Sequence, residues 1–274
     1  MARLKEYNGH YCESEYEYAF IGFLEAEGWK YSSGNNISRV TKRDVLIADD
    51  FKKFIADTNP DLTEDEVIQI YDNVRLVGAE SDFATLHKVY GWMVNGVQFT
   101  TQDGLPRMIP LIDFDNWDKN IFRVVNQFTV EYTNNGQKEN RRPDVLLFVN
   151  GMPLCVVELK NPVDANATIY DAWEQINIRY WRDIPHLLHY CPLACISDGV
   201  KTRLGTVRTP YEHFYAWRRV NEGDVVSTLP FAETETMIKG VYTPERFVEI
   251  FRDYIYFQDS IYDSDEVEIV CRYP

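Results

Sequence analysis

The segment 141–160 constrains the fold more than any other part of the chain. Two apolar, β-branched runs flank Asn150-Gly151, a pattern that predicts a β-hairpin. Three ionisable residues interrupt it: Asp144 before the first run, and Glu158 and Lys160 at the end of the second. Burying charges at strand ends is costly unless a partner or a metal ion compensates them. The hairpin is therefore the first candidate for a functional site.

The alternation of side chains along a strand places Glu158 and Lys160 on one face. Asp144 faces Glu158 if the hairpin has a three-residue loop, a bulge, or a splay at its open end. A two-residue loop with regular pairing would instead set Asp144 against Val157. Opposed residues have Cβ atoms about 5 Å apart, close enough for two carboxylates to hold one divalent ion.

Two carboxylates suit Mg²⁺, a hard ion that takes few protein oxygens and keeps several waters. Such an ion activates a bound water and binds a phosphate oxygen, while a lysine orients that water or neutralises developing charge. The pattern therefore predicts a phosphodiester hydrolysis site. Asp144 and Glu158 are the predicted metal ligands, and Lys160 is the predicted catalytic lysine.

Composition limits the classes of function. The chain has 274 residues and is 45% hydrophobic, which argues against disorder. No apolar run reaches the length of a membrane span and the first residues lack a signal-peptide pattern, so we expect a cytoplasmic protein without membrane contact. The net charge of -15 argues against tight DNA binding through the whole surface. A nuclease with this charge would need affinity from partners or from other domains.

The N-terminal half is predicted to be mainly helical. A periodic apolar pattern indicates a helix from about Tyr11 to Gly28, with Glu17 on its apolar face. Glu17 is either an acid that favours the helix dipole or one presented to a metal site. Capping signals at Thr41, at Thr63 and at Ser81 predict three more helices, over 42–56, 64–77 and 82–94.

The rest of the chain is predicted to form mainly strands. The predicted strands are 97–100, 107–112, 121–132, 193–197, 203–209, 213–220 and 267–271, and the predicted helices are 170–183 and 245–257. We therefore expect an α/β fold with a mixed, largely antiparallel central sheet flanked by helices. Residues 1–40 would supply the N-terminal helix and a strand of the core, 41–95 a helical subdomain, and 96–274 the remaining core with the start of a linker.

Pro143-Asp144 followed by Glu158-Leu159-Lys160 resembles the PD-(D/E)xK nuclease motif. The context is more specific than the motif alone. The surrounding series resembles the N-terminal nuclease domain of the restriction (R) subunit of Type I restriction enzymes, and runs in order through Leu111-Ile112-Asp113-Phe114-Asp115, Val124–Val130, Arg142-Pro143-Asp144, Val149–Pro153, Glu158–Pro162 and Cys195–Gly199.

The resemblance implies an Mg²⁺-dependent endonuclease that cuts DNA within a complex of restriction, modification and specificity subunits. ATP would act only through motor domains outside this chain, which contains no phosphate-binding G-x-x-x-x-G-K-[ST] loop. The family also carries a Gln-x-x-x-Tyr element after the lysine strand. Gln175 and Tyr180 match it with one extra residue between them, and on a regular α-helix Gln175 would not face with Tyr180.

Two other functional classes compete with the nuclease. An acidic α/β module could serve as a catalytically silent docking domain of a larger DNA-processing assembly. A glycosidase acid pair at Asp144 and Glu158 is disfavoured, because Lys160 would lower the pKa of the glutamate that must act as a general acid. A divalent-ion titration separates the nuclease from the silent module.

Overall fold

The chain forms a mixed α/β fold in a computed structural model that describes residues 13–78, 81–160, 168–227, 229, 231–259 and 267–271. The helices are α1 (Glu13–Ala26), α2 (Ala48–Thr58), α3 (Glu64–Arg75), α4 (Asp82–Asn95), α5 (Ile169–Glu174), α6 (Trp181–Asp183), α7 (Pro185–Leu188), α8 (Ala232–Val241) and α9 (Pro244–Asp253), with the shorter or distorted helical segments η1 (Gly34–Asn36), η2 (Trp117–Lys119), η3 (Gln175–Tyr180) and η4 (Tyr211–His213). The strands are β1 (Lys30–Ser33), β2 (Val97–Thr100), β3 (Pro106–Ile109), β4 (Phe122–Asn126), β5 (Val130–Asn134), β6 (Gln137–Arg141), β7 (Val145–Val149), β8 (Met152–Leu159), β9 (Leu193–Ser197), β10 (Thr202–Thr206), β11 (Ile255–Asp259) and β12 (Val267–Cys271).

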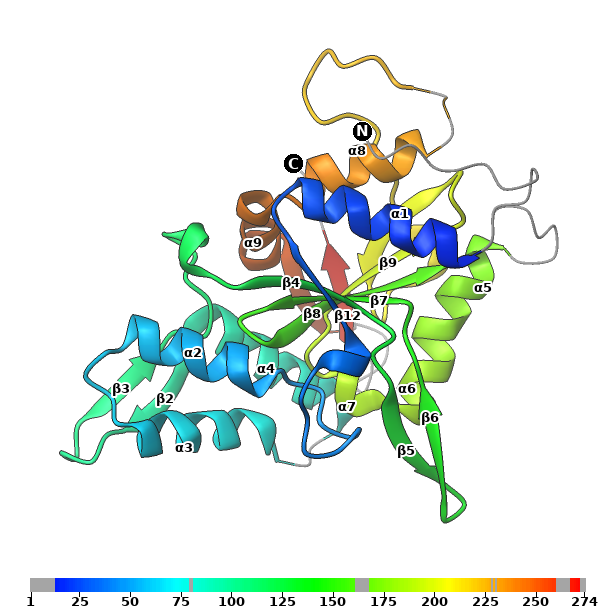
Figure 1. The fold of residues 1–274 in the computed structure, drawn as a ribbon. Coiled ribbons are helices and arrows are strands. Elements are labelled where there is room, and N and C mark those ends of the chain that lie inside the picture. Colours follow the sequence, from blue (N-terminus) through cyan, green and yellow to red (C-terminus); the bar gives the residue numbers. More distant parts are fainter. Residues whose placement is uncertain are drawn as a thin grey trace.

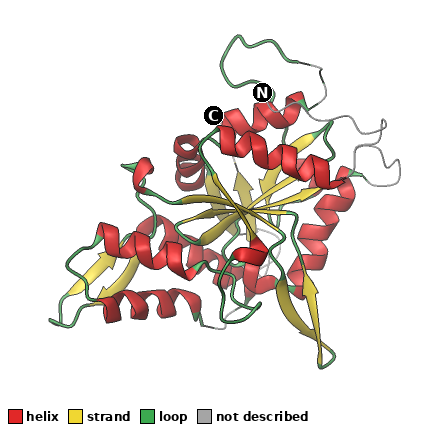
Figure 2. Cartoon of the chain, viewed as in Figure 1, coloured by secondary structure: helices red, strands yellow, loops and turns green. Residues whose placement is uncertain are grey.

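The central sheet has six strands in the order β1-β4-β7-β8-β9-β10 (Figures 1 and 2). The pairs β1/β4 and β8/β9 are parallel, and the other three are antiparallel. Every residue of β7 and β8 is buried, as expected for strands covered on both faces. The sheet confirms the predicted fold class and places the hairpin at its centre.

Helices cover both faces of this sheet. Helix α1 contacts β8 and β4 and packs beside α8, and Figure 1 shows these two helices together above the strands. The continuous helical stretch α5–η3–α6 also contacts β8. Cys155 approaches Tyr242, which follows α8, whereas Glu158 contacts η3, so the odd and even positions of β8 point to opposite layers.

The turn of the central hairpin is fixed on several sides. Asn150 and Gly151 have φ values of 51° and 76°, the left-handed pair of a type I′ turn. The Asn150 side chain donates to the Leu111 carbonyl and accepts from the Ile121 amide, both at 2.8–2.9 Å. The Gly151 carbonyl accepts from Ile47 at 2.8 Å. A Cβ on Gly151 would collide with the Ile47 carbonyl and lie 2.8 Å from the Phe51 nitrogen, so only glycine fits.

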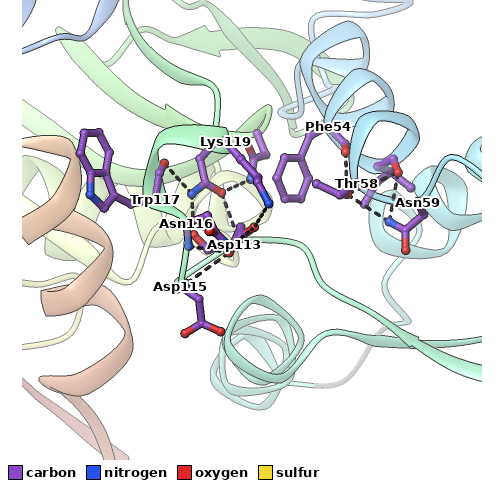
Figure 3. Close-up of polar contacts among 11 residues, drawn as sticks. Phe54, Thr58, Asn59, Asp113, Asp115, Asn116, Trp117 and Lys119 are labelled. Carbon is purple, nitrogen blue, oxygen red and sulfur yellow. Dashed lines mark hydrogen bonds and ion pairs between the residues drawn. The ribbon is translucent and has the colours of Figure 1, made fainter.

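The loop that receives this turn is itself closed by polar contacts, shown in Figure 3. The Asp113 carboxylate accepts from the backbone amides of Asp115 and Asn116, at 3.2 and 2.8 Å. Buried Asn120 bonds back to the Asp113 carbonyl at 2.7 Å and accepts from Asn150 at 2.8 Å. The loop therefore presents a fixed set of partners to the Asn150 side chain.

The hairpin combines a two-residue loop with a bulge. Val149 pairs with Met152, so the loop is Asn150-Gly151 and the predicted three-residue loop is wrong. The register then shifts by one residue, and Val145 pairs with Val157. The predicted alternative of a bulge is confirmed, and it sets Asp144, before Val145, opposite Glu158, after Val157.

The predicted long strand 121–132 is wrong because Gln127 interrupts it. Gln127 has a φ of 56°, which ends β4 at Asn126 and turns the chain away from the sheet. The next residues form β5, which pairs with β6 to make a two-stranded hairpin that we call the arm (residues 130–141). Figure 1 shows the arm projecting from the body of the molecule, and its second strand leads into Asp144.

Two other predicted elements differ from the structure. The helix expected from Lys42 begins at Ala48, because the Thr41 hydroxyl bonds to Asp44 in a local turn and Val45–Ile47 enters the core as an extended segment. The strand expected over 213–220 is reduced to a single bridge between Tyr215 and Leu204. Helix α8 was not expected at all.

Other local signals are confirmed. Thr63 and Glu66 form the predicted capping box of α3, and Ser81 caps α4 through the Ala84 amide. The strand 267–271 pairs with β11. The division into a helical subdomain at 41–95 and a flanking core remains a prediction. No helix in the described part of the chain is both long and apolar enough to cross a bilayer.

Candidate active site

The open end of the hairpin brings Asp144 and Glu158 together. The Asp144 amide donates to Glu158 Oε1 at 3.4 Å, and the Asp144 carboxylate accepts from the Leu159 amide at 2.8 Å. Glu158 is fully buried and Asp144 partly so. The bulge in β8 produces this pairing, since regular pairing from a two-residue loop would have opposed Asp144 to Val157.

The environment of Glu158 disfavours its charged form. Burial raises the pKa of Glu158 well above 4.5, and the neighbouring Asp144 carboxyl raises it further through repulsion and a side-chain hydrogen bond. The Tyr180 hydroxyl and the Lys160 ammonium group act in the opposite direction. Among the described residues, burial and the Asp144 carboxyl thus outweigh Tyr180 and Lys160, and the Glu158 carboxyl favours its protonated form.

A π-helix brings Gln175 and Tyr180 to the same carboxylate. Residues 175–180 form η3, whose wider turn places positions five apart on one face. The Tyr180 hydroxyl donates to Glu158 Oε1 and the Gln175 amide to Glu158 Oε2, both at 2.6 Å. The extra residue relative to the Gln-x-x-x-Tyr pattern is thus absorbed by the helix, and the expectation that the two side chains would diverge is wrong.

Lys160 completes the cluster through Gln175. The Lys160 ammonium group donates to Gln175 Oε1 at 2.8 Å, while the other end of the same amide donates to Glu158. The Lys160 amide donates to the Ser197 carbonyl at 2.8 Å, which continues the parallel pairing of β8 with β9 past Leu159. The predicted placement of Glu158 and Lys160 on one face is confirmed by their shared partner.

Glu17 has different partners. It is buried on α1, and its carboxylate accepts from Asn126 at 2.6 Å and from Gln127 at 3.4 Å. Asn126 pairs with Val145, which pairs with Val157, so Asn126 lies on the opposite sheet face from Glu158. The hydrogen bonds thus link Glu17 to the end of β4, and its participation in catalysis remains a prediction.

A buried ring of hydroxyl groups lies behind the lysine strand, and no sequence signal beyond a turn at 197–199 indicated it. The Tyr16 hydroxyl bonds to Ser197 at 2.5 Å and to Thr234 at 3.1 Å, and Thr202 bonds to Ser197 at 2.7 Å and to Thr234 at 2.8 Å. Burial raises the pKa of Tyr16 to about 12, so its phenol stays protonated. The ring ties α1, β9, β10 and α8 together directly behind the Ser197 carbonyl that holds Lys160.

The two arginines before Asp144 behave differently from one another. Arg141 pairs with Asp183 at 2.6 Å and lies over the Tyr132 ring, which fixes the base of the arm to α6. Arg142 is exposed. A phosphate contact at this turn is therefore open to Arg142 rather than to Arg141.

Comparison with known proteins shows similarity to type I restriction enzyme subunits over most of the chain. Residues 11–213 match the family model described as "Type I restriction enzyme R protein N terminus". A Haemophilus influenzae protein, the type I restriction enzyme HindI endonuclease subunit, is 30% identical over 265 residues, which cover 91% of this chain and 24% of that protein. A Methanocaldococcus jannaschii protein with a name of the same kind is 31% identical over 264 residues, 87% of this chain and 25% of the relative.

Similarity extends to Staphylococcus aureus, where the type I restriction enzyme SauCOLORF180P endonuclease subunit is 30% identical over 130 residues, 46% of this chain and 13% of the relative. The chain spans about a quarter of the length of the Haemophilus influenzae and Methanocaldococcus jannaschii relatives. The family match covers the hairpin, the π-helix and the strand that holds Lys160. This chain belongs to the family of type I restriction enzyme R protein N-terminal regions.

Proposed function

We propose that this chain is a nuclease domain that hydrolyses DNA phosphodiester bonds with Mg²⁺ at Asp144, Glu158 and Lys160. The observation that carries the proposal is the hydrogen-bond network centred on Glu158. A fully buried carboxylate beside a second carboxyl, linked through one amide to a lysine, has no structural advantage over an apolar strand end.

The residues present fit a magnesium ion. Asp144 and Glu158 offer hard oxygen ligands, and Glu158 Oε2 keeps a lone pair beyond its bond from Gln175. The described residues hold no cluster of three or more His, Cys, Asp or Glu side chains, so the remaining ligands would be water, backbone and substrate oxygens. A divalent ion would balance the negative charge of the carboxyl pair.

Each side chain has a role that follows from its contacts. When bound, Mg²⁺ would supply charge neutralisation at a phosphate oxygen and a more acidic water. Lys160 would stabilise the extra negative charge of the attacked phosphate, with its position held by Gln175. Tyr180 would keep Glu158 ionised and oriented.

The proposal extends to the assembly. The names of the relatives describe endonuclease subunits of type I restriction enzymes, and three quarters of their length lies outside the region matched here. We propose that modification and specificity subunits select the DNA and that ATP acts through motor domains beyond this chain. This arrangement agrees with the net charge of -15, since the affinity for DNA would come mainly from those parts.

Calorimetric titration with Mg²⁺ and Mn²⁺ tests the metal site directly. We expect binding to the chain to be lost in Glu158→Ala and kept in Asp57→Asn, which removes an exposed carboxylate on α2. DNA cleavage by the assembled enzyme carrying Lys160→Ala tests the chemistry. If the wild-type chain binds neither ion and the Lys160→Ala enzyme still cuts, the domain is a silent acidic module and the nuclease proposal fails.

A further inference from the structure

A second site lies on the same sheet face as Glu158. The segment after β1, residues 34–42, crosses below the sheet beside β5, as Figure 1 shows. Together with Thr129 it lines a cavity of about 360 Å³. Arg39 and Lys42 are the charged residues of this lining. The cavity is therefore positive, on a chain that is strongly negative overall.

The position of Arg39 relative to the hairpin follows from two ring contacts. The Arg39 guanidinium lies 3.8 Å from the centroid of the Phe128 ring, and that ring packs against Phe148 with 5.4 Å between centroids. Phe148 is four residues after Asp144 and shares its strand face. At about 3.3 Å per residue, Phe148 lies roughly 13 Å from Asp144. The two ring contacts extend this path, so the Arg39 guanidinium lies within roughly 22 Å of Asp144, a distance that a few nucleotides of a strand can span.

The Asp44 carboxylate acts on the charge of Arg39 from nearby, but its hydrogen bonds go to other residues. Arg39 donates one bond, to the Asp44 carbonyl at 3.2 Å, and leaves most of its five N–H donors unused. The Asp44 carboxylate is instead occupied by Thr41 and by Arg75. Within the described ranges, neither Arg39 nor Lys42 forms an ion pair with an acidic side chain. An anion of suitable shape would meet two available cations.

A larger cavity near β1 provides an internal contrast. It measures about 500 Å³ and contains Arg123, which makes two bonds of 2.6 Å to Asp50. Its lining also includes Asp49, so that cavity has no unbalanced positive charge. The cavity beside Arg39 is thus favoured as an anion site even though it is smaller.

The cavity is also held in shape before any ligand arrives. A Cβ on Gly34 would lie 2.6 Å from Phe128 Cα, so the crossing segment touches the chain after β4 with no space for a side chain. At the other end, the Lys42 carbonyl accepts from the Glu131 amide at 3.0 Å. Stacking on Phe128 restricts the guanidinium plane. Such pre-organisation reduces the entropy lost on binding.

We propose that this cavity binds a backbone phosphate of the DNA strand that enters the hairpin site, with Arg39 and Lys42 as its ligands. The proposal rests on the proposed nuclease function, since it assumes that the hairpin acts on DNA. Guanidinium and ammonium groups recognise phosphate oxygens without reading base edges. The contact would position the strand and carry no sequence preference, in keeping with a subunit that does not choose the site.

Fluorescence anisotropy with a labelled duplex, without divalent ions, tests the proposal. We expect the Arg39→Gln/Lys42→Gln chain to bind about 10-fold or more weakly, and the slope of log affinity against log salt to fall by about one per residue. Lys53→Gln/Lys239→Gln makes the same change in charge at exposed residues of α2 and α8 and should leave affinity nearly unchanged. Circular dichroism confirms that both variants are folded.

The outcomes separate this site from the hairpin. Equal losses in the two double variants, an unchanged salt slope, or a wild-type chain that binds no duplex even at low salt would each overturn the phosphate site. Because the binding is measured without metal, failed Mg²⁺ and Mn²⁺ titrations together with continued cleavage by the Lys160→Ala enzyme would reject the nuclease proposal and leave this result standing.

Discussion

The turn and the open end of the central hairpin differ in how well their polar groups are accommodated. At the turn, the Asn150 side chain is hydrogen-bonded to the Leu111 carbonyl and the Ile121 amide, and Gly151 packs so closely that no side chain would fit there. At the open end, burial and the neighbouring Asp144 carboxyl raise the pKa of Glu158, and the Gln175 amide bridges Lys160 to Glu158. The turn contributes to stability, whereas the open end buries a carboxyl group whose charged form is unfavourable there.

This difference indicates how a site that is costly to bury can persist in a stable fold. A site whose charges are poorly balanced without a ligand lowers the stability of its own surroundings, and the rest of the structure must compensate. The turn, the bulge and the complete burial of β7 and β8 provide that compensation within the same two strands. Changes at the two ends should therefore affect activity and stability in opposite ways.

The largest expected effect is at the open end. Glu158→Gln keeps the volume but removes a buried acid, so cleavage should fall about 10³-fold or more while the free energy of unfolding rises by about 1–2 kcal/mol. Cleavage by the assembled enzyme and urea unfolding of the chain measure the two quantities. Glu25→Gln, an exposed change on α1, should alter neither. A Glu158→Gln chain that is less stable than wild type would contradict the contrast.

At the turn, Gly151→Ala should cost about 3 kcal/mol of stability, because the new Cβ meets the Ile47 carbonyl and the φ of 76° is unfavourable. Gly136→Ala in the arm is the matched control: its φ is 79° but its Cβ would have open space, so the cost should be about 1 kcal/mol. Chemical denaturation gives both values. Equal costs would mean that the packing around Gly151 is unimportant.

The stability of the wild-type chain should depend on pH through Glu158. Its folded pKa lies above its unfolded pKa, so between the two the folded state binds the extra proton and stability falls as pH rises, by up to about 1.4 kcal/mol per pH unit. Urea unfolding from pH 4 upward measures this slope. The slope should be smaller in Glu158→Gln and reduced by Mg²⁺. An identical slope in the variant would assign the effect to other groups.

Tyr180→Phe should have a moderate effect on activity. The lost hydroxyl donates to Glu158 at 2.6 Å and lowers its pKa, so the pKa should rise further and cleavage near neutral pH should fall roughly 10-fold. The acid limb of the pH–rate profile should move to higher pH. Tyr190→Phe removes a buried hydroxyl bonded to the Val74 carbonyl and should affect stability alone. A profile that does not shift in Tyr180→Phe would exclude this role.

The smallest effect is expected from deleting Ile178, an exposed residue of the π-helix. The deletion should convert η3 to an α-helix in which Gln175 and Tyr180, now four apart, still share a face. Cleavage should remain close to wild type. Deleting exposed Glu249 from the regular helix α9 rotates the residues after it and should destabilise the chain. Equal damage from both deletions would show that the wider turn is required.

Much of the site was predictable because it depends on local rules. The alternation of β8 placed Glu158 and Lys160 together. The conflict between an Asn-Gly turn and the position of Asp144 left a three-residue loop, a bulge or a splay open, and the structure has the bulge. The central strands were also clear, since apolar β-branched runs bounded by turns have few alternatives. These predictions needed only the period of a strand and the preferences of a turn.

The rest depended on single residues or on tertiary contacts. The left-handed Gln127 divides a run that reads as one strand, and no side-chain pattern marks that conformation. The wider turn at 175–180 is invisible to helical periodicity, which assumes 3.6 residues per turn. The hydroxyl ring joins Tyr16 to Thr234 across most of the sequence. Such features arise from packing rather than from neighbouring residues.

The arm offers a route for attaching a reporter to the molecule. Its base is clamped by the Arg141–Asp183 pair and by the 2.6 Å bond from Tyr132 to Glu139, while its tip at Asn135-Gly136 is exposed. A dye or short peptide placed at that tip would be separated from Asp144 by the clamp, so its motion would not reach the reacting groups. Rotation or quenching of such a dye would then test whether the proposed DNA substrate or partner subunits reach the arm, with the chemistry left intact.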